Sequence, residues 1–193
     1  MALRKFGEIA EDIINRHALV AGTRRYRIVE IEFYLHSPTH RDSTVHMNER
    51  QEMHGHWYVH RAGRAASAKY ATFATRVGID LTLGKSGEPF GILIRAVSDM
   101  ESGRRIDGPI KVLNELFGVR AAYKMGGNYD AYFAHAARVE SCGAFEKNPT
   151  LYLEPAKLKR YEISFLPRTG INQRLHPESS RLPYKAIVMQ SLM

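Results

Sequence analysis

The nine-residue stretch RIVEIEFYL, residues 27–35, is the most informative part of this sequence for the fold. Within it apolar residues alternate with Glu30, Glu32 and Tyr34, and a period of two is typical of a β-strand with two chemically different faces. We therefore expect a strand over Tyr26–Leu35 whose second face carries two carboxylates and a phenol.

The segments around this strand predict a mixed fold. Apolar residues recur at helical spacing from Phe6 to Ile14, and Asp107–Gly118 has Pro109 in its first turn and a glycine to end it. Short strands are expected at Trp57–His60, Gly78–Leu83, Gly91–Val97, Thr150–Leu153 and Glu162–Leu166. The short link at residues 84–89 implies antiparallel pairing. We predict an α+β fold: a single compact domain, residues 1–193, with a largely antiparallel curved sheet flanked by a few helices.

Composition limits the class of protein. The chain has 193 residues, 44% of them hydrophobic, and no uninterrupted apolar run of membrane-spanning length. Its first residues mix charges with apolar side chains and lack the apolar centre of a secretory signal. Cys142 is the single cysteine, so no intrachain disulfide can form, which fits a reducing compartment. We expect a protein that is not secreted, and that is cytoplasmic (bacterial nucleoid) or nuclear.

Charge points to a polyanionic partner. The net charge is +8 with a pI near 9.7, and Met53–Ile79 contains no acidic residue. A second basic stretch begins at Ile163. If the fold brings the two stretches together, they form one phosphate-binding face, and otherwise they are two solvated loops. The candidate DNA-binding residues are Arg61, Arg64, Lys69, Arg76 and Arg168.

One charged residue stands out in the later strand. Arg95 lies in an otherwise apolar segment, and a buried guanidinium needs a carboxylate or a site to fill. Glu32 is its natural partner, and Tyr34, two residues further on, lies on the same face as Glu32. A carboxylate beside an aromatic ring could serve a purine-hydrolysing pocket, although a plain structural ion pair explains the same residues.

Six histidines fall within 25 residues, which suggests a second hypothesis. These residues are His36, His40, His46, His54, His56 and His60. Together with Asp42 or Glu52 they could hold zinc, but no helical HExxH pair is present. Exposed loop histidines are the alternative.

Several segments, in order along nearly the whole chain, resemble the alkyladenine (3-methyladenine) DNA glycosylase family. Residues 27–35 match seven of nine positions of the family's R-I-V-E-T-E-A-Y-L segment. Asp42–His46 repeats its D-x-x-x-H, and GILIRAV, residues 91–97, is similar to its V-L-L-R-A-L strand. Shorter similarities include Tyr58-Val59, Gly108-Pro109 with Lys111, Leu151–Glu154, Pro167–Ile171 and Leu182-Pro183.

The resemblance implies roles for particular residues. In the family, the second glutamate of the strand activates the attacking water and the strand arginine helps to hold that water, which implies catalytic roles for Glu32 and Arg95. Substrate contacts are implied for Tyr34, His46, His60 and Asp80. The resemblance implies no cofactor and no metal, and a partner that is double-stranded DNA with a damaged purine. Oligomeric state is left open, with a monomer expected.

This sequence departs from the family at positions that affect base selection and flipping. His60 replaces the tyrosine that sandwiches the base, and Asp80 replaces an asparagine that screens against guanine's amino group. The position of the family's intercalating tyrosine falls near Gly63, with no aromatic residue before Tyr70. Phe33 stands where the family has a small alanine.

Three functions are compatible with these observations. The first is a monofunctional DNA N-glycosylase that excises alkylated or deaminated purines in base excision repair. The second is a catalytically altered nucleic-acid-binding relative, favoured by the departures at the pocket. The third is a metalloenzyme built on the histidine-rich loop. We rank them in this order.

Overall fold

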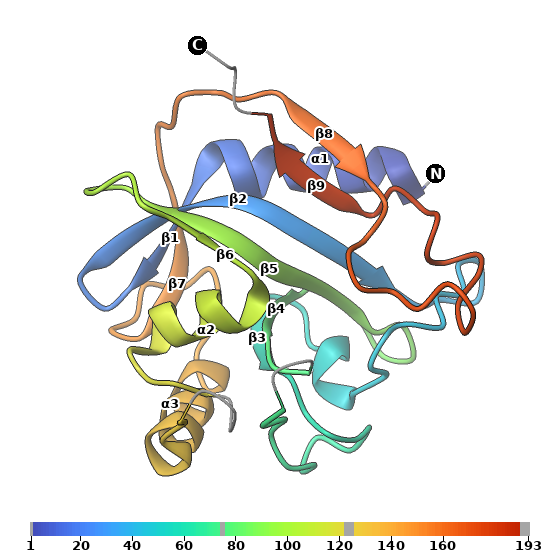
Figure 1. Ribbon diagram of the computed structural model, residues 1–193, viewed down its shortest axis with the longest axis horizontal. Helices are drawn as coiled ribbons and strands as arrows, with labels where there is room; N and C mark the ends of the chain where they lie inside the picture. The colour runs from blue at the N-terminus through green and yellow to red at the C-terminus, as the bar shows by residue number, and fades with distance from the viewer. Residues whose placement is uncertain (1, 74–75, 122–125, 190–193) are drawn as a thin grey trace.

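A computed structural model describes residues 2–73, 76–121 and 126–189 of the chain. In these ranges nine strands form one curled sheet in which every pairing is antiparallel (Figure 1). The strands are β1 (His17–Ala21), β2 (Arg24–Leu35), β3 (His56–Val59), β4 (Ile79–Thr82), β5 (Phe90–Asp99), β6 (Arg105–Asp107), β7 (Leu151–Pro155), β8 (Ile163–Leu166) and β9 (Lys185–Val188). The main path runs β3-β4-β5-β2-β1-β7; β6 pairs with β5, and β9 joins β8 to β2.

Helices pack around this sheet. They are α1 (Ala2–Arg16), α2 (Pro109–Phe117) and α3 (Tyr129–Glu140), with a short 3-10 helix, η1, at Glu49–Glu52. Helix α1 packs against β1 and β2, α2 against β5 and β6, and α3 against β3 (Figure 1). The predicted α+β single domain with a largely antiparallel curved sheet is confirmed.

The predicted first strand is confirmed as β2, which begins two residues earlier than expected. Its two-residue alternation is interrupted, because the register with β5 shifts between Ile28 and Glu30. At this irregularity Ile28 and Val29 are both buried, although neighbouring residues of a regular strand point to opposite faces. Beyond it the alternation resumes and places Glu32 and Tyr34 on one face.

The opposite face of β2 belongs to the hydrophobic core. The Phe6 ring of α1 stacks on Phe33 with 4.4 Å between ring centroids, and Tyr184 meets Phe6 edge-on at 5.0 Å. Burying one such aromatic side chain contributes about 1.5–3 kcal/mol. Because α1 covers the Phe33 side of the sheet, the side that carries Glu32 and Tyr34 is available for a site.

The predicted helix at 107–118 is confirmed as α2, and its ends have the expected causes. Pro109 occupies its first turn, where no backbone N–H is needed for a helical hydrogen bond. Gly118 ends it in the left-handed conformation with a φ of 65°, which favours glycine. Its buried stripe keeps the helix on β5, so its first residue reaches the pocket described below.

Five elements were not anticipated from the sequence: β1, η1, β6, α3 and β9. Two of them decide where the site lies. Strand β9 pairs with β2 beside Glu32, and α3 supplies a buried carboxylate to the β3 region. In the described ranges no helix has both the length and the apolar character needed to cross a membrane.

Candidate active site

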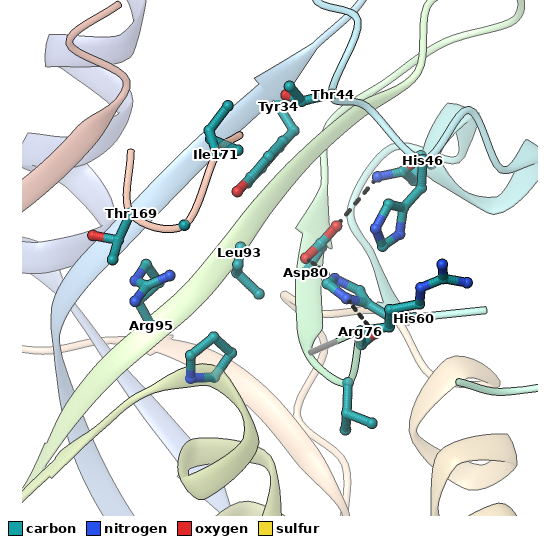
Figure 2. Close-up of a pocket in the computed structure, with 14 residues that line it drawn as sticks. Tyr34, Thr44, His46, His60, Arg76, Asp80, Leu93, Arg95, Thr169 and Ile171 are labelled. Atoms are coloured by element: carbon teal, nitrogen blue, oxygen red, sulfur yellow. Dashed lines mark hydrogen bonds and ion pairs between the residues drawn. The ribbon is translucent and has the colours of Figure 1, made fainter. Parts of the chain in front are cut away.

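A pocket of about 420 Å³ opens on the face of β2, β5 and β4 that carries Tyr34 (Figure 2). Segments far apart in sequence line it, including the loop before β3, the β3–β4 connection and the segment after β8. The lining residues are Tyr34, Thr44, His46, Gln51, His60, Arg76, Val77, Asp80, Leu93, Arg95, Pro109, Thr169, Gly170 and Ile171. The two basic stretches of the sequence therefore border one cavity.

Three cross-strand neighbours fix the geometry of the pocket. Leu93 of β5 lies opposite Glu32 of β2 on one side and opposite Asp80 of β4 on the other. Residues directly opposite each other in a sheet share a face, so all three side chains point the same way. Adjacent strands lie about 4.8 Å apart, which places Glu32 and Asp80 roughly 10 Å apart at their Cα atoms. Leu93 lies between them as part of the pocket floor.

The Glu32 side chain lies beneath the pocket surface and is fully buried. Its Oε1 accepts a hydrogen bond from the backbone N–H of Thr169 at 2.7 Å, and its Oε2 accepts one from the Tyr34 hydroxyl at 2.8 Å. Arg95 Nη1 lies 3.4 Å from Oε2. These three donors all line the pocket, whereas Glu32 itself does not. The three donors therefore separate the Glu32 carboxylate from the cavity.

The predicted pairing of Arg95 with Glu32 is confirmed, and Arg95 has a second carboxylate partner. Its Nε donates to Glu30 Oε1 at 3.0 Å, and only 16% of its side chain is exposed. Glu30 also lies 3.7 Å from Arg105. Two carboxylates thus orient a guanidinium that reaches the pocket wall, where it can donate hydrogen bonds to a ligand or a water molecule.

Tyr34 links the buried carboxylate to the cavity. Burial, the Glu32 charge and the hydrogen bond to that carboxylate raise the pKa of the Tyr34 hydroxyl well above its ordinary value, so it stays protonated and donates. The Arg168 guanidinium lies over its ring, 4.6 Å from the centroid. The ring is therefore held in place at the edge of the pocket (Figure 2).

On the far wall, Asp80 is held by two other side chains. His60 Nε2 lies 2.7 Å from Asp80 Oδ1, and Gln51 Nε2 donates to Asp80 Oδ2 at 3.2 Å. The other nitrogen of His60, Nδ1, lies 3.1 Å from the backbone carbonyl of Arg76. Both ring nitrogens thus face acceptors. Figure 2 shows Asp80 and His60 side by side, across the pocket from Arg95 and Thr169.

His46 completes this wall, and we expect its imidazole to be uncharged at neutral pH. Although His46 reaches solvent through the pocket, enclosure by its walls and the His60 ring, 4.4 Å away, lower the pKa of His46 to about 4. An NMR titration, assigned with His46→Gln, should give a midpoint well below the value of about 6.5 for a histidine in a model peptide. A midpoint at 6.5 or higher would contradict this expectation.

The six histidines of the predicted metal loop are dispersed in the structure. His46 and His60 meet in the pocket, whereas His40 packs against Tyr184 and His54 lies near the Leu83 carbonyl. Within the described ranges, no three His, Cys, Asp or Glu side chains are grouped as metal ligands would be. The geometry therefore gives no support to a histidine-loop metal centre.

Two of the expected phosphate contacts are wrong. Arg61 has only 6% of its side chain exposed, and its guanidinium pairs with Glu140 of α3 while lying over the Tyr70 ring. The Arg168 side chain is fully buried and bridges Asp42 through both of its terminal nitrogens. Each guanidinium is used inside the protein, so neither can reach a DNA backbone.

The other three candidate DNA-binding residues remain available. Arg64, Lys69 and Arg76 are exposed and lie on the β3–β4 connection. Arg76 also lines the pocket. This connection therefore presents cations beside the cavity, as a protein that approaches a polyanion requires.

Several pocket residues had no assigned role in the sequence interpretation. Gln51 is fixed by a capping box at η1, in which its Oε1 accepts from the Asn48 backbone N–H at 3.3 Å. Thr169 and Ile171 come from the segment after β8. Gln51 has no sequence signal beyond a short polar turn, but the P-R-T-G-I segment had already been noted at 167–171.

Comparisons with known proteins add one relationship. No protein-family model matches the chain. An uncharacterized protein of Acanthamoeba polyphaga mimivirus is 32% identical to it over 204 residues, an alignment that covers 96% of this chain and 87% of the viral protein. Identity at this level over nearly the full length of both proteins indicates common ancestry and a common fold. The chain belongs to the same protein family as this uncharacterized mimivirus protein.

Proposed function

We propose that this protein is a monofunctional DNA N-glycosylase that releases damaged purines from double-stranded DNA. The observation that carries the proposal is the arrangement of Glu32, Tyr34 and Arg95 at one end of a pocket of about 420 Å³, large enough to admit a flipped purine. Aromatic and imidazole rings border the cavity, and exposed cations flank it. An enzyme that acts on a flipped base needs this combination of stacking groups, a water-activating carboxylate and a phosphate-binding rim.

The chemistry would begin with a water molecule at the Arg95 side of the pocket. Arg95 would hold this water, and Glu32 would accept its proton as the water attacks C1′ of the sugar. The C1′–N9 bond breaks in this step, and its electron pair leaves with the purine. The negative charge of Glu32 would also stabilise the positive charge that develops on the sugar. The contact between Arg95 Nη1 and Glu32 Oε2 is long, at 3.4 Å, so the water would enter between these two groups. Tyr34 and Thr169 would keep their hydrogen bonds to the carboxylate.

Base flipping leaves a gap in the duplex, and Phe73 is the side chain best placed to fill it. Phe73 is 68% exposed and lies on the β3–β4 connection, three residues before pocket-lining Arg76. Tyr70, the other aromatic residue nearby, is tied down because its hydroxyl donates to Glu140 at 2.8 Å. Inserting an apolar side chain between base steps is a known way to stabilise distorted DNA.

Substitutions on this connection should separate phosphate contact from insertion. In an Arg64→Ala/Lys69→Ala variant, the slope of log Kobs for DNA against log salt concentration should become shallower by about 2, or about 0.9 per lost contact. Phe73→Ala should weaken binding without changing that slope, since it removes no charge. Arg160→Ala, which removes a 79%-exposed guanidinium near Glu11, is the matched control. Equal slopes for all four proteins would exclude this face as the DNA-binding surface.

A second candidate function is nucleic-acid binding without catalysis. It is favoured by the complete burial of Glu32 and by its three hydrogen-bond donors, which are also what a structural ion pair requires. In this case the pocket would hold a base or nucleotide without releasing it.

Base release distinguishes the two functions. Labelled duplexes with a single hypoxanthine, ethenoadenine, 3-methyladenine or 7-methylguanine are incubated with the protein, and abasic sites are read as alkali-sensitive strand breaks. Breaks above those of the protein-free duplex support the glycosylase. Salt-dependent binding of all the duplexes without breaks supports the binding protein instead.

A further inference from the structure

The far wall of the pocket is built around a carboxylate whose hydrogen-bonding capacity is only half used. Each oxygen of Asp80 can accept two hydrogen bonds. Among the residues that the structure describes, Oδ1 has His60 as its partner and Oδ2 has Gln51, which leaves each oxygen one further lone pair. The Gln51 amide orientation is fixed because its oxygen accepts from the Asn48 backbone, which leaves its nitrogen to donate to Asp80. Asp80 therefore offers hydrogen-bond acceptors to a ligand.

The backbone makes room for this arrangement. A Cβ atom at position 91 would lie 2.5 Å from Asp80 Oδ2 and 2.8 Å from Gln51 Nε2. Only glycine permits the carboxylate and the amide to meet at this point of β5. Asp80 is 2% exposed and still lines the pocket, so its position is set by packing and not by solvent.

Proton transfer does not explain this pair. A histidine that acts as a general base needs a free ring nitrogen directed at its substrate. Both nitrogens of His60 already face protein acceptors, Asp80 and the Arg76 carbonyl. His60 therefore positions Asp80, and the remaining lone pairs of Asp80 are left for a ligand. Glu32, Leu93 and Asp80 lie opposite one another on three adjacent strands and form a cross-strand row. The Cα atoms of Asp80 and Glu32 are therefore two strand spacings, or roughly 10 Å, apart.

We propose that Asp80 selects purines whose pairing edge carries adjacent N–H donors, which makes N7-alkylated guanine the preferred lesion class. This inference rests on the proposed glycosylase function. With the sugar near Glu32, the pairing edge of the base points along the row toward Asp80. Guanine presents N1–H and the 2-amino group there, and the free lone pairs of Asp80 accept from both.

The competing lesions fit this wall less well. Hypoxanthine keeps N1–H but lacks the 2-amino group, so Asp80 would lose one of its two ligand hydrogen bonds. Ethenoadenine has no N–H on this edge, so Asp80 would lose both. A site built to bond an N–H group rejects an analogue without it far more strongly than an apolar pocket rejects a small change in size. Alkylation at N7 gives the base a positive charge, which Asp80 attracts and which weakens the glycosidic bond. Undamaged guanine lacks that activation.

The test compares single-turnover base release from duplexes with 7-methylguanine, hypoxanthine or ethenoadenine, each divided by the spontaneous rate of the same duplex. We expect the wild-type protein to favour 7-methylguanine over ethenoadenine by at least about 100-fold. Asp80→Asn keeps the shape and replaces one acceptor with a donor, so this preference should fall at least tenfold.

A binding measurement keeps the test independent of the stability of Asp80→Asn. A Glu32→Gln protein is titrated with duplexes that carry guanine or hypoxanthine opposite thymine, which differ only in the 2-amino group. Tighter binding of the guanine duplex is expected. If the wild type releases ethenoadenine at a normalised rate equal to or faster than that of 7-methylguanine, the inference about Asp80 is overturned, while the proposed glycosylase function still stands. Absence of release from every duplex would instead reject the proposed function.

Discussion

Replacing Glu32 with glutamine is expected to lower the single-turnover rate of base release by about 10²- to 10⁴-fold, the usual contribution of a positioned acid–base group. Glutamine has the same shape, and its oxygen can still accept from the Thr169 amide. The Tyr34 hydroxyl can rotate to accept from the new amide group. The variant therefore loses the charge and the base while it keeps the pocket, and its affinity for DNA should change by less than about threefold, or about 0.6 kcal/mol.

Glu30→Gln is the matched control for this variant. Glu30 lies on the same strand and pairs with the same guanidinium, at 3.0 Å, but the hydrogen bonds of the Tyr34 hydroxyl and the Thr169 amide go to Glu32. If Glu32 acts on the water, Glu30→Gln should reduce base release by less than tenfold. Equal losses of base-release rate in the two variants would show that the rate depends on the negative charge around Arg95 and not on Glu32 as a specific proton acceptor.

The sequence was sufficient for the parts of the site that depend on local periodicity. The alternation in residues 27–35 placed Glu32 and Tyr34 on one face, and the single charge in the 91–97 strand identified Arg95 as a partner. Both inferences need only the two-residue period of a strand and the cost of burying an unpaired charge. The two ends of α2 were likewise predicted from local signals, Pro109 in the first turn and Gly118 at the end.

Other features depend on contacts between distant segments. Arg61 lies in an acid-free stretch, yet its carboxylate partner is on α3, 79 residues later. Arg168 pairs with Asp42 across 126 residues. Local charge counts cannot reveal such pairs, so both arginines were interpreted as surface cations. Asp80 was identified by resemblance alone, and its pairing with Gln51 and His60 became evident only from the side-chain contacts of the folded chain.

Strand β9 and helix α3 were also missed. The four residues of strand β9 are held by pairing with β2 and β8, and these pairings are contacts between separate segments of the chain. In α3, polar and apolar residues are spread around the helix, so its sequence lacks a clear amphipathic stripe. Its best signal is Asn128, whose side chain caps the helix by accepting from the Ala131 N–H at 3.1 Å. Tertiary packing, not local preference, stabilises both elements.

Replacing Arg168 with methionine is expected to destabilise the protein by about 3–5 kcal/mol, because it leaves the buried Asp42 carboxylate without its partner. Both side chains are fully buried, and the Arg168 guanidinium also donates to the carbonyls of Phe33 at 3.0 Å and Ser179 at 3.2 Å. Equilibrium unfolding in urea at pH 7 measures the loss. Arg4→Met, which removes an exposed pair with Glu8, is the control and should cost no more than about 1 kcal/mol.

The pH dependence should identify the same pair. Burial alone would raise the pKa of the Asp42 carboxyl, but hydrogen bonds from Arg168 and Thr44 more than offset it and hold that pKa below its ordinary value. The bridge therefore stabilises the fold above the unfolded-state pKa of about 3.9, and this contribution is lost as the pH falls through the folded-state pKa. In Arg168→Met this acid-dependent loss should be absent.

A double variant separates the unpaired charge from the remaining contacts. Asp42→Asn/Arg168→Met removes both charges, so it should regain part of the stability that Arg168→Met loses. Recovery will be incomplete, because two backbone carbonyls still lack their donor. Thr169, the next residue, donates to Glu32, so a displaced Arg168 should also slow base release in protein that remains folded. A double variant no more stable than Arg168→Met would show that those carbonyl contacts, and not the charge on Asp42, carry the energy.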